Sequence, residues 1–178
     1  MAYTDDSVKA KLSALNDTQE GIVSVAQWIM FHRRHADRTA QLWQQRLKDS
    51  NASKRLNLVY LANEVVQQSK ARQKKEFVMA FSNIIADATA AAYRGAPNDI
   101  QQKLRRVIEV WRARQIFDPA IQDAIERNVD GEFHLAPLAI TRTSNCADAG
   151  PNQASPQNRD RPHPFQQEIR PRRWLTLR

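Results

Sequence analysis

From Ser7 to about Phe133, apolar residues recur every three or four positions, and this spacing constrains the fold more than any other feature of the chain. No segment alternates Val, Ile or Thr with polar residues, and no Asn-Gly dipeptide marks a hairpin. Glycine is scarce, with four in 178 residues, as is typical of a stack of helices. The pattern therefore predicts an all-α fold.

About seven amphipathic segments follow one another with only short loops between them. They span residues 5–15, 17–35, 36–50, 51–70, 74–95, 96–117 and 118–129. Residues that favour helix ends mark their boundaries: Asp17 or Thr18, Asn51 or Ser53, Gly95, Asp118 and Pro119. Short loops between amphipathic helices favour antiparallel neighbours, stacked into a bundle or a curved solenoid.

The composition changes after Phe133. Six of the eight prolines lie in residues 134–178, where apolar residues become sparse. We interpret residues 1–133 as one folded domain and residues 134–178 as a disordered Pro/Arg-rich tail. The formal charge of +8 divides evenly, since the tail holds seven Arg and three acidic residues, and the domain 20 basic and 16 acidic residues. The tail motif RPRRW is either a nuclear-import or nucleic-acid patch, or a solvated segment without a role.

Several classes of function lack their sequence signals. The one cysteine, Cys146, lies in the tail, so we expect no disulfide or zinc site in the domain and a reducing, intracellular compartment. There is no apolar leader and no run of about 18 apolar residues, so we expect a soluble, non-secreted protein. No phosphate-binding loop or nucleophile motif occurs, and we expect neither catalysis nor a cofactor. His32 and His35 are three positions apart, and we expect a surface or helix-packing role for them rather than metal binding.

The segment 56–70 carries a polar stripe on what is otherwise a core helix. At 100° per residue, one side collects Leu58, Leu61, Ala62, Val65 and Ser69. The opposite side collects Leu56, Tyr60, Asn63, Gln67 and Lys70. One interpretation is a groove wall that meets a partner with both apolar and backbone polar groups. The other is a stripe half-buried against a neighbouring helix, with Asn63 capping something local.

A second helix shows a similar division. In residues 96–117, one face collects Leu104, Ile108 and Trp111 as core. A separate stripe collects Lys103, Arg106, Val107, Val110 and Arg114. Two valines among three cations suit a ligand with a small apolar group beside a phosphate. The alternative is an ordinary salt-bridged surface, with Asp99 or Glu109 as partners.

Three segments together resemble a known family. NDTQEGIVSVAQWIMFHRRHA, LNLVYLANEVVQQSK and LRRVIEVWRARQIF are similar to the CTD-interacting domain, or CID, of the RPRD/CREPT branch, which includes a fungal transcription-termination factor. The resemblance extends from about Ser7 to Glu132. It implies a right-handed superhelical stack of about eight helices, related to the VHS and ENTH folds.

The resemblance also implies a ligand. Domains of this kind bind the Tyr-Ser-Pro-Thr-Ser-Pro-Ser heptads of the largest RNA polymerase II subunit, and this branch prefers phosphoserine at the second position. By position, Arg106 matches the phosphate contact and Asn63 matches a hydrogen-bonding residue near the peptide tyrosine. The remaining matches are the apolar wall of Tyr60, Val107 and Val110, a polar contact at Gln19, and outlying cations at Lys70 and Arg114. Gln67 completes the expected set from its place in the stripe.

The chain departs from the family pattern at two places, where Glu64 replaces an Asp or His and Gly21 replaces a Ser. The resemblance implies a nuclear, non-enzymatic reader in transcription termination and 3′-end processing. A termination exoribonuclease and cleavage and polyadenylation factors are further candidate partners, and no membrane partner is expected. A VHS/ENTH-like trafficking adaptor and RNA binding by the domain or tail remain the alternatives.

Overall fold

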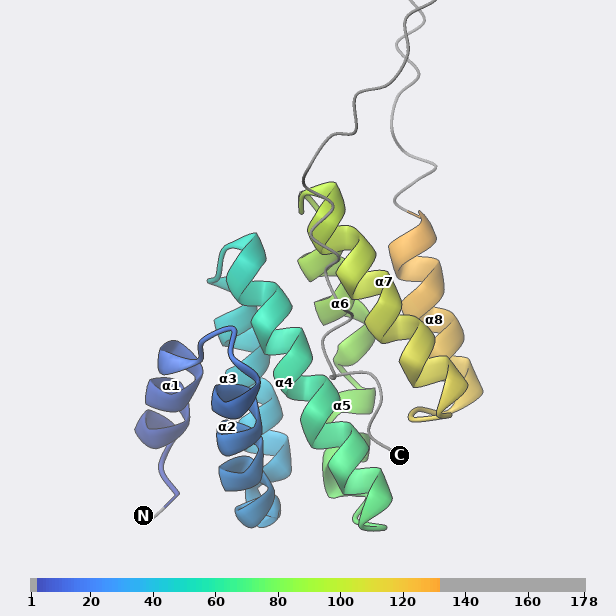
Figure 1. The fold of residues 1–178 in the computed structure, drawn as a ribbon. Coiled ribbons are helices and arrows are strands. Elements are labelled where there is room, and N and C mark those ends of the chain that lie inside the picture. Colours follow the sequence, from blue (N-terminus) through green and yellow to red (C-terminus); the bar gives the residue numbers. More distant parts are fainter. Residues whose placement is uncertain (1–2, 132–178) are drawn as a thin grey trace, which may run out of the picture. The chain divides into compact units, whose positions relative to one another are not determined.

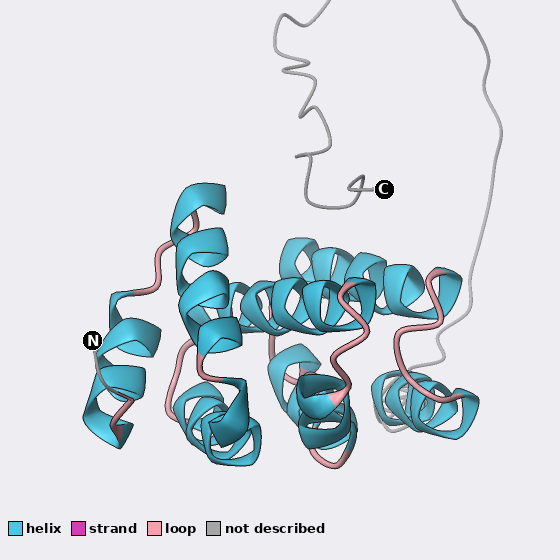
Figure 2. Cartoon of the chain, turned by 90° about the horizontal axis from the view of Figure 1, so that it is seen from below, coloured by secondary structure: helices cyan, strands magenta, loops and turns pink. Residues whose placement is uncertain are grey.

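The computed structural model describes residues 3–131, and every regular element in that range is helical (Figures 1 and 2). Within this range the elements are α1 (Asp5–Ala14), α2 (Gln19–Phe31), η1 (Arg33–His35, a 3₁₀ turn), α3 (Ala36–Lys48), α4 (Ala52–Ala71), α5 (Glu76–Ser82), α6 (Ile85–Tyr93), α7 (Asn98–Ala113) and α8 (Pro119–Asp130). The prediction of an all-α stack is confirmed for this part of the chain. The predicted tail, residues 134–178, lies outside the described residues.

The helix ends form where the sequence places capping residues. The Thr18 hydroxyl accepts a hydrogen bond from the Gly21 N–H (3.2 Å), at the start of α2. The Asn51 side chain accepts one from the Lys54 N–H (2.9 Å), at the start of α4. Gly95 has a φ of +68°, the left-handed conformation that ends a helix most easily at glycine. These contacts decide between the alternatives that the sequence left open at the two N-termini.

The single helix predicted over residues 74–95 is wrong, because the chain forms α5 and α6 with a break at Asn83 and Ile84. α5 packs against α3 and α4, where Phe81 meets the Trp43 ring edge-on at 5.0 Å. α6 instead packs chiefly against α8. The break allows the two halves to reach different neighbours, which one straight helix could not do.

α4 is the central helix of the described residues. It contacts α2, α3, α5, α6 and α7, and ten of its twenty residues are buried. The Trp43 indole N–H of α3 donates to the Leu58 carbonyl of α4 (2.9 Å), so this buried polar group is satisfied within the core. Within residues 3–131, no helix has the length and apolar content to cross a membrane.

The site is positioned by three helices that pack in the order α2, α4, α7. α2 and α7 both contact α4, and Figure 1 shows α4 and α7 running side by side. α1 packs mainly on α3, and α8 packs on α6 and α7, so these two helices lie at the ends of the stack. The result is a central helix with its neighbours on either flank.

Candidate functional site

The predicted site residues lie on three elements. Gln19 is the first residue of α2, and the polar stripe from Tyr60 to Lys70 is on α4. Arg106, Val107 and Val110 are on α7, and Arg114 is the residue that ends this helix. α4 contacts both α2 and α7, and its contacts with α7 join residues 44 to 48 positions apart in the sequence.

A chain of side-chain amides joins α4 to α7. Asn63 Oδ1 accepts hydrogen bonds from Trp111 Nε1 (2.9 Å) and from Gln67 Nε2 (2.7 Å). Gln67 Oε1 in turn accepts one from the Arg114 guanidinium. The Trp111 indole and the Arg114 guanidinium can only donate, so these two donors fix the orientation of the Asn63 and Gln67 amides between them. The Nδ2 amide of Asn63 makes no hydrogen bond within residues 3–131.

Lys70 ties the same two helices together at their C-terminal ends. Its ammonium donates to the backbone carbonyls of Arg114 (3.1 Å) and Gln115. These carbonyls are at the C-terminus of α7, where a cation also meets the negative end of the helix dipole. The contacts of Asn63, Gln67 and Lys70 progress along α7 in chain order, so α4 and α7 run parallel.

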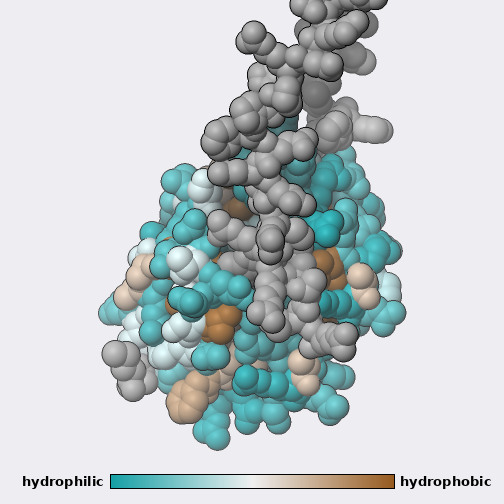
Figure 3. Space-filling view, viewed as in Figure 1, coloured by the Kyte–Doolittle hydropathy of each residue, from teal (hydrophilic) through white to brown (hydrophobic). Residues whose placement is uncertain are grey.

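Two members of the polar stripe of α4, Asn63 and Gln67, are thus partly or fully buried against a neighbouring helix, as the second interpretation expects. Asn63 is 3% exposed, Gln67 is half-buried and only Lys70 is exposed. Tyr60 is also half-buried. In the area that the grey atoms leave visible, the face drawn in Figure 3 is mostly hydrophilic, with small separate hydrophobic areas.

The second stripe is divided. Val107 is 1% exposed and belongs to the core, so the prediction that it lies on an open surface is wrong. Val110, one turn further along α7, is half-buried and remains at the surface. Lys103 pairs with Asp99 at 3.5 Å, as the salt-bridged alternative expected.

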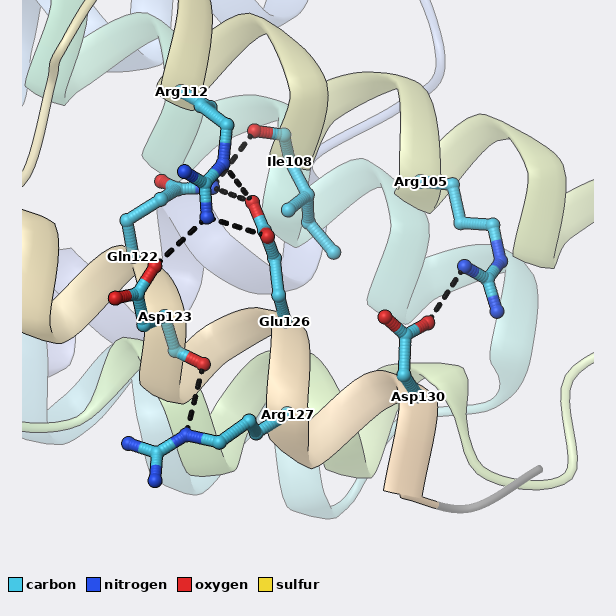
Figure 4. Close-up of polar contacts among 8 residues, drawn as sticks. All are labelled: Arg105, Ile108, Arg112, Gln122, Asp123, Glu126, Arg127 and Asp130. Carbon is cyan, nitrogen blue, oxygen red and sulfur yellow. Dashed lines mark hydrogen bonds and ion pairs between the residues drawn. The ribbon is translucent and has the colours of Figure 1, made fainter. Parts of the chain in front are cut away.

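Arg106 differs from the other arginines of α7. It is exposed, and within residues 3–131 it makes no hydrogen bond or ion pair. Figure 4 shows how two of its neighbours are held by α8. Arg105 meets Asp130 at 2.8 Å, and Arg112 lies between Asp123 (2.8 Å) and Glu126 (2.6 Å).

These contacts also shift ionisation equilibria. The hydrogen bond from Arg112 lowers the pKa of Glu126 below its usual value, and a further bond from Gln122 acts in the same direction. The pKa of Arg112 is raised, chiefly by its bond to Glu126 and then by its bond to Asp123. Arg112 is therefore committed to the α7–α8 contact, whereas Arg106 is available to a ligand.

Two features of the site region escaped the sequence analysis. Trp111 was assigned to the core by its spacing, and it is fully buried, yet its N–H also holds Asn63. Glu64 is 9% exposed and accepts a hydrogen bond from Gln68 Nε2 (2.7 Å). Its burial follows from the position of α4 between several helices, which no local pattern reveals.

Both histidine rings contact aromatic neighbours, with His32 half-buried and His35 exposed. His35 stacks on Tyr3 with ring centroids 4.1 Å apart, and His32 lies 4.5 Å from Trp28. In the part of the chain that the structure describes, no three His, Cys, Asp or Glu side chains are grouped so as to hold a metal ion.

Comparisons with known proteins complete the description. A family model described as the CID domain matches residues 6–125. A UPF0400 protein of Schizosaccharomyces pombe is 38% identical over 162 residues, which cover 89% of this chain and 40% of that protein. The Homo sapiens regulation of nuclear pre-mRNA domain-containing protein 1A is 24% identical over 164 residues, 89% of this chain and 52% of the relative. The Homo sapiens protein 1B is 28% identical over 116 residues, 65% and 35% of the two chains. The chain thus spans about half the length, or less, of these curated relatives.

Proposed function

The chain belongs to the CID family, and from that premise we propose that it binds the heptad repeats at the C-terminus of the largest RNA polymerase II subunit. The preferred form carries phosphoserine at the second position of the heptad. The relatives named as regulators of nuclear pre-mRNA support a role of this kind.

The observation that carries the proposal is the availability of Arg106. A guanidinium that is exposed, and that no carboxylate among residues 3–131 neutralises, can make charge-assisted hydrogen bonds to a phosphate. Val110 lies one turn further along the same helix and supplies apolar surface next to it. Tyr60 and the Nδ2 amide of Asn63 offer aromatic and polar contacts from α4.

The energies of these contacts divide between affinity and selectivity. A heptad contains two prolines, which restrict the free peptide and reduce the entropy lost on binding. We expect the apolar surface to provide most of the affinity, in the micromolar range. One contact to a charged group contributes about 1.5–3 kcal/mol, or roughly a tenfold to hundredfold preference for the phosphorylated peptide. Many heptads on one polymerase would raise occupancy without any new contact.

In the cell, a reader of this kind acts in the nucleus, in transcription termination and 3′-end processing, without catalysing a reaction. Its candidate partners beyond the polymerase are a termination exoribonuclease and cleavage and polyadenylation factors. We propose that Gln19, Gln67, Lys70 and Arg114 contribute at the edges of the peptide site, whereas Val107 supports it from the core.

The test is a titration of the full chain with heptad peptides that are unmodified or phosphorylated at the second, fifth or seventh residue. Arg106→Gln is expected to remove the preference for second-position phosphoserine, and to leave the binding of the plain peptide within about twofold. Lys103→Gln is the matched control, because this cation is on the same helix and is paired with Asp99. If both variants keep the wild-type preference, or if no heptad peptide binds, the proposal is wrong.

A further inference from the structure

Phe31, the last residue of α2, is 82% exposed. Large apolar side chains are rarely this exposed among residues 3–131, where Met79 (66%) is the other case. An isolated exposed apolar residue needs no explanation by itself. The surroundings of Phe31 are what make it informative.

The Phe31 ring stands on a packed aromatic cluster. Within the described range, the ring that contacts it is His32, at a centroid distance of 5.1 Å and an angle of 88°. His32 lies against Trp28 at 4.5 Å and against Tyr3 at 5.7 Å. Tyr3 is held in place by its stack on His35 and by a hydrogen bond to the Thr39 hydroxyl (3.0 Å). Phe31 is therefore held on one side by His32, while most of its ring faces solvent.

Beside Phe31 is a surface hollow of about 470 Å³ whose lining residues include Arg33, Arg34, His35 and Arg72. No Asp or Glu lines it. Arg33 forms an ion pair with Glu76 at 3.7 Å, but nearly half of each side chain is exposed. A pair of this kind contributes little to folding stability. Arg34 and Arg72 make no ion pair within residues 3–131. We name Phe31, Arg33, Arg34 and Arg72 the basic–aromatic patch.

We propose that the basic–aromatic patch binds single-stranded RNA, with a base stacked on Phe31 and phosphates on the arginines. An exposed aromatic ring next to a positively charged hollow is the arrangement that binds single strands without strong sequence preference. Duplex RNA offers no free base face for stacking. Membrane binding would call for a wide apolar face on an amphipathic helix, and here the exposed apolar side chain is a single ring.

The basic–aromatic patch is separate from the proposed peptide site. Arg72 ends α4 two residues after Lys70, at the edge of the peptide site, whereas Phe31, Arg33 and Arg34 are at the end of α2 and in η1. Arg106, on α7, does not line the hollow. The two proposals therefore rest on different residues, and a failure of one does not imply failure of the other.

The experiment measures fluorescence anisotropy of a labelled, unstructured RNA of about twelve nucleotides, a length within the range that one such surface covers, with the full chain. Phe31→Ala is expected to weaken binding about tenfold, and Phe31→Trp to retain it, because stacking needs an aromatic ring. A double variant, Arg34→Gln with Arg72→Gln, should weaken binding. It should also make the slope of log affinity against log salt concentration shallower, by about 0.7 for each phosphate that the protein no longer neutralises. Any RNA contact by residues 134–178 is common to all variants and cancels in the comparison.

Two controls make the outcome decisive. Met79→Ala removes the other exposed apolar side chain and should leave RNA affinity unchanged. Arg106→Gln should likewise keep RNA affinity while it alters phosphopeptide binding. The proposal is overturned if Phe31→Ala binds RNA as the wild type does, or if Met79→Ala weakens binding equally. It is also overturned if the full chain binds anionic vesicles through Phe31 and no RNA. Because Phe31 is so exposed, its replacement should leave the thermal melting curve unchanged.

Discussion

Asn63 has a structural role and a proposed binding role, and the two use different atoms of its side chain. Its Oδ1 satisfies the buried N–H of Trp111, while Nδ2 remains for a ligand. Asn63→Ala should destabilise the fold by about 1–3 kcal/mol, because the Trp111 N–H loses its acceptor inside the protein. Urea unfolding measures this loss.

Asn63→Asp separates the two roles. The carboxylate can still accept from Trp111 and Gln67, so both contacts are kept, and the stability lost is the cost of burying the new charge. It cannot donate, so binding of the heptad peptide should weaken while the fold is kept. Unchanged peptide affinity in this variant would show that the ligand does not use Nδ2.

Gly21 leaves space for the loop that precedes α2. A Cβ at this position would overlap Asn16 Oδ1, which itself accepts a hydrogen bond from the Thr18 hydroxyl (2.7 Å). Gly21→Ala should therefore destabilise the chain slightly. The gain in helix propensity is at most about 1 kcal/mol, and the displacement of Asn16 costs more than this gain. In an Asn16→Ala background the same change should stabilise. A double-mutant cycle by thermal unfolding gives the coupling, and additive effects would contradict this account.

At the scale of elements, the contact between α7 and α8 depends on pH through Glu126. Its folded-state pKa lies below the usual value of 4.5, mainly because Arg112 donates a hydrogen bond to it. A lowered pKa means that the carboxylate stabilises the fold above the unfolded-state pKa, and that this contribution is lost as pH falls through the folded-state value. The pair is partly exposed, so we expect about 1 kcal/mol or less.

Glu126→Gln should lower the melting temperature by a few degrees at neutral pH and flatten the loss of stability between about pH 5 and pH 3. Glu109→Gln is the control, since this carboxylate is exposed on α7 and makes no ion pair within the described residues. An equal acid response in both variants would remove Glu126 as the cause.

Helical periodicity in the sequence is sufficient to locate most helices. It is insufficient where contacts with other helices decide where a helix ends. The caps at Thr18, Asn51 and Gly95 are local, and each was visible in the sequence. The division between α5 and α6 was not, because residues 74–95 contain no proline and no glycine before Gly95, and the break serves contacts with α3 and α8.

The site shows the same limit. Helical geometry grouped Tyr60, Asn63, Gln67 and Lys70 correctly on one side of α4, but it could not show that α7 covers part of that side. The burial of Val107 has the same origin. Both depend on the parallel packing of two helices whose contacting residues are more than 40 positions apart, for which a single sequence carries no local signal.

At the scale of the whole molecule, the described residues form a stack with a strongly buried centre and, at α1, an end with fewer neighbours. α4 contacts five helices, whereas α1 packs mainly on α3 and buries chiefly Val8, Leu12 and Leu15. In such a stack, opening of a terminal helix costs less free energy than opening of the centre. Amides of α1 should therefore exchange with solvent by local opening, and those of Leu58 to Val66 only by global unfolding.

Two core substitutions test this gradient by native-state hydrogen exchange. Leu12 and Leu58 are both fully buried, and each change to Ala should cost about 2–5 kcal/mol locally. Leu58→Ala should lower protection of the amides that exchange only by global unfolding, including those of α4, and should leave the locally opening amides of α1 nearly unchanged. Leu12→Ala should accelerate exchange in α1 by the full amount of its cost. In α4 it should reduce protection by the same amount, because global unfolding also detaches α1, and a smaller reduction would mean that α4 opens while α1 stays folded. Equal protection of α1 and α4 in the wild type would instead mean that the stack unfolds as a single cooperative unit, with its terminal helix as firmly held as its centre.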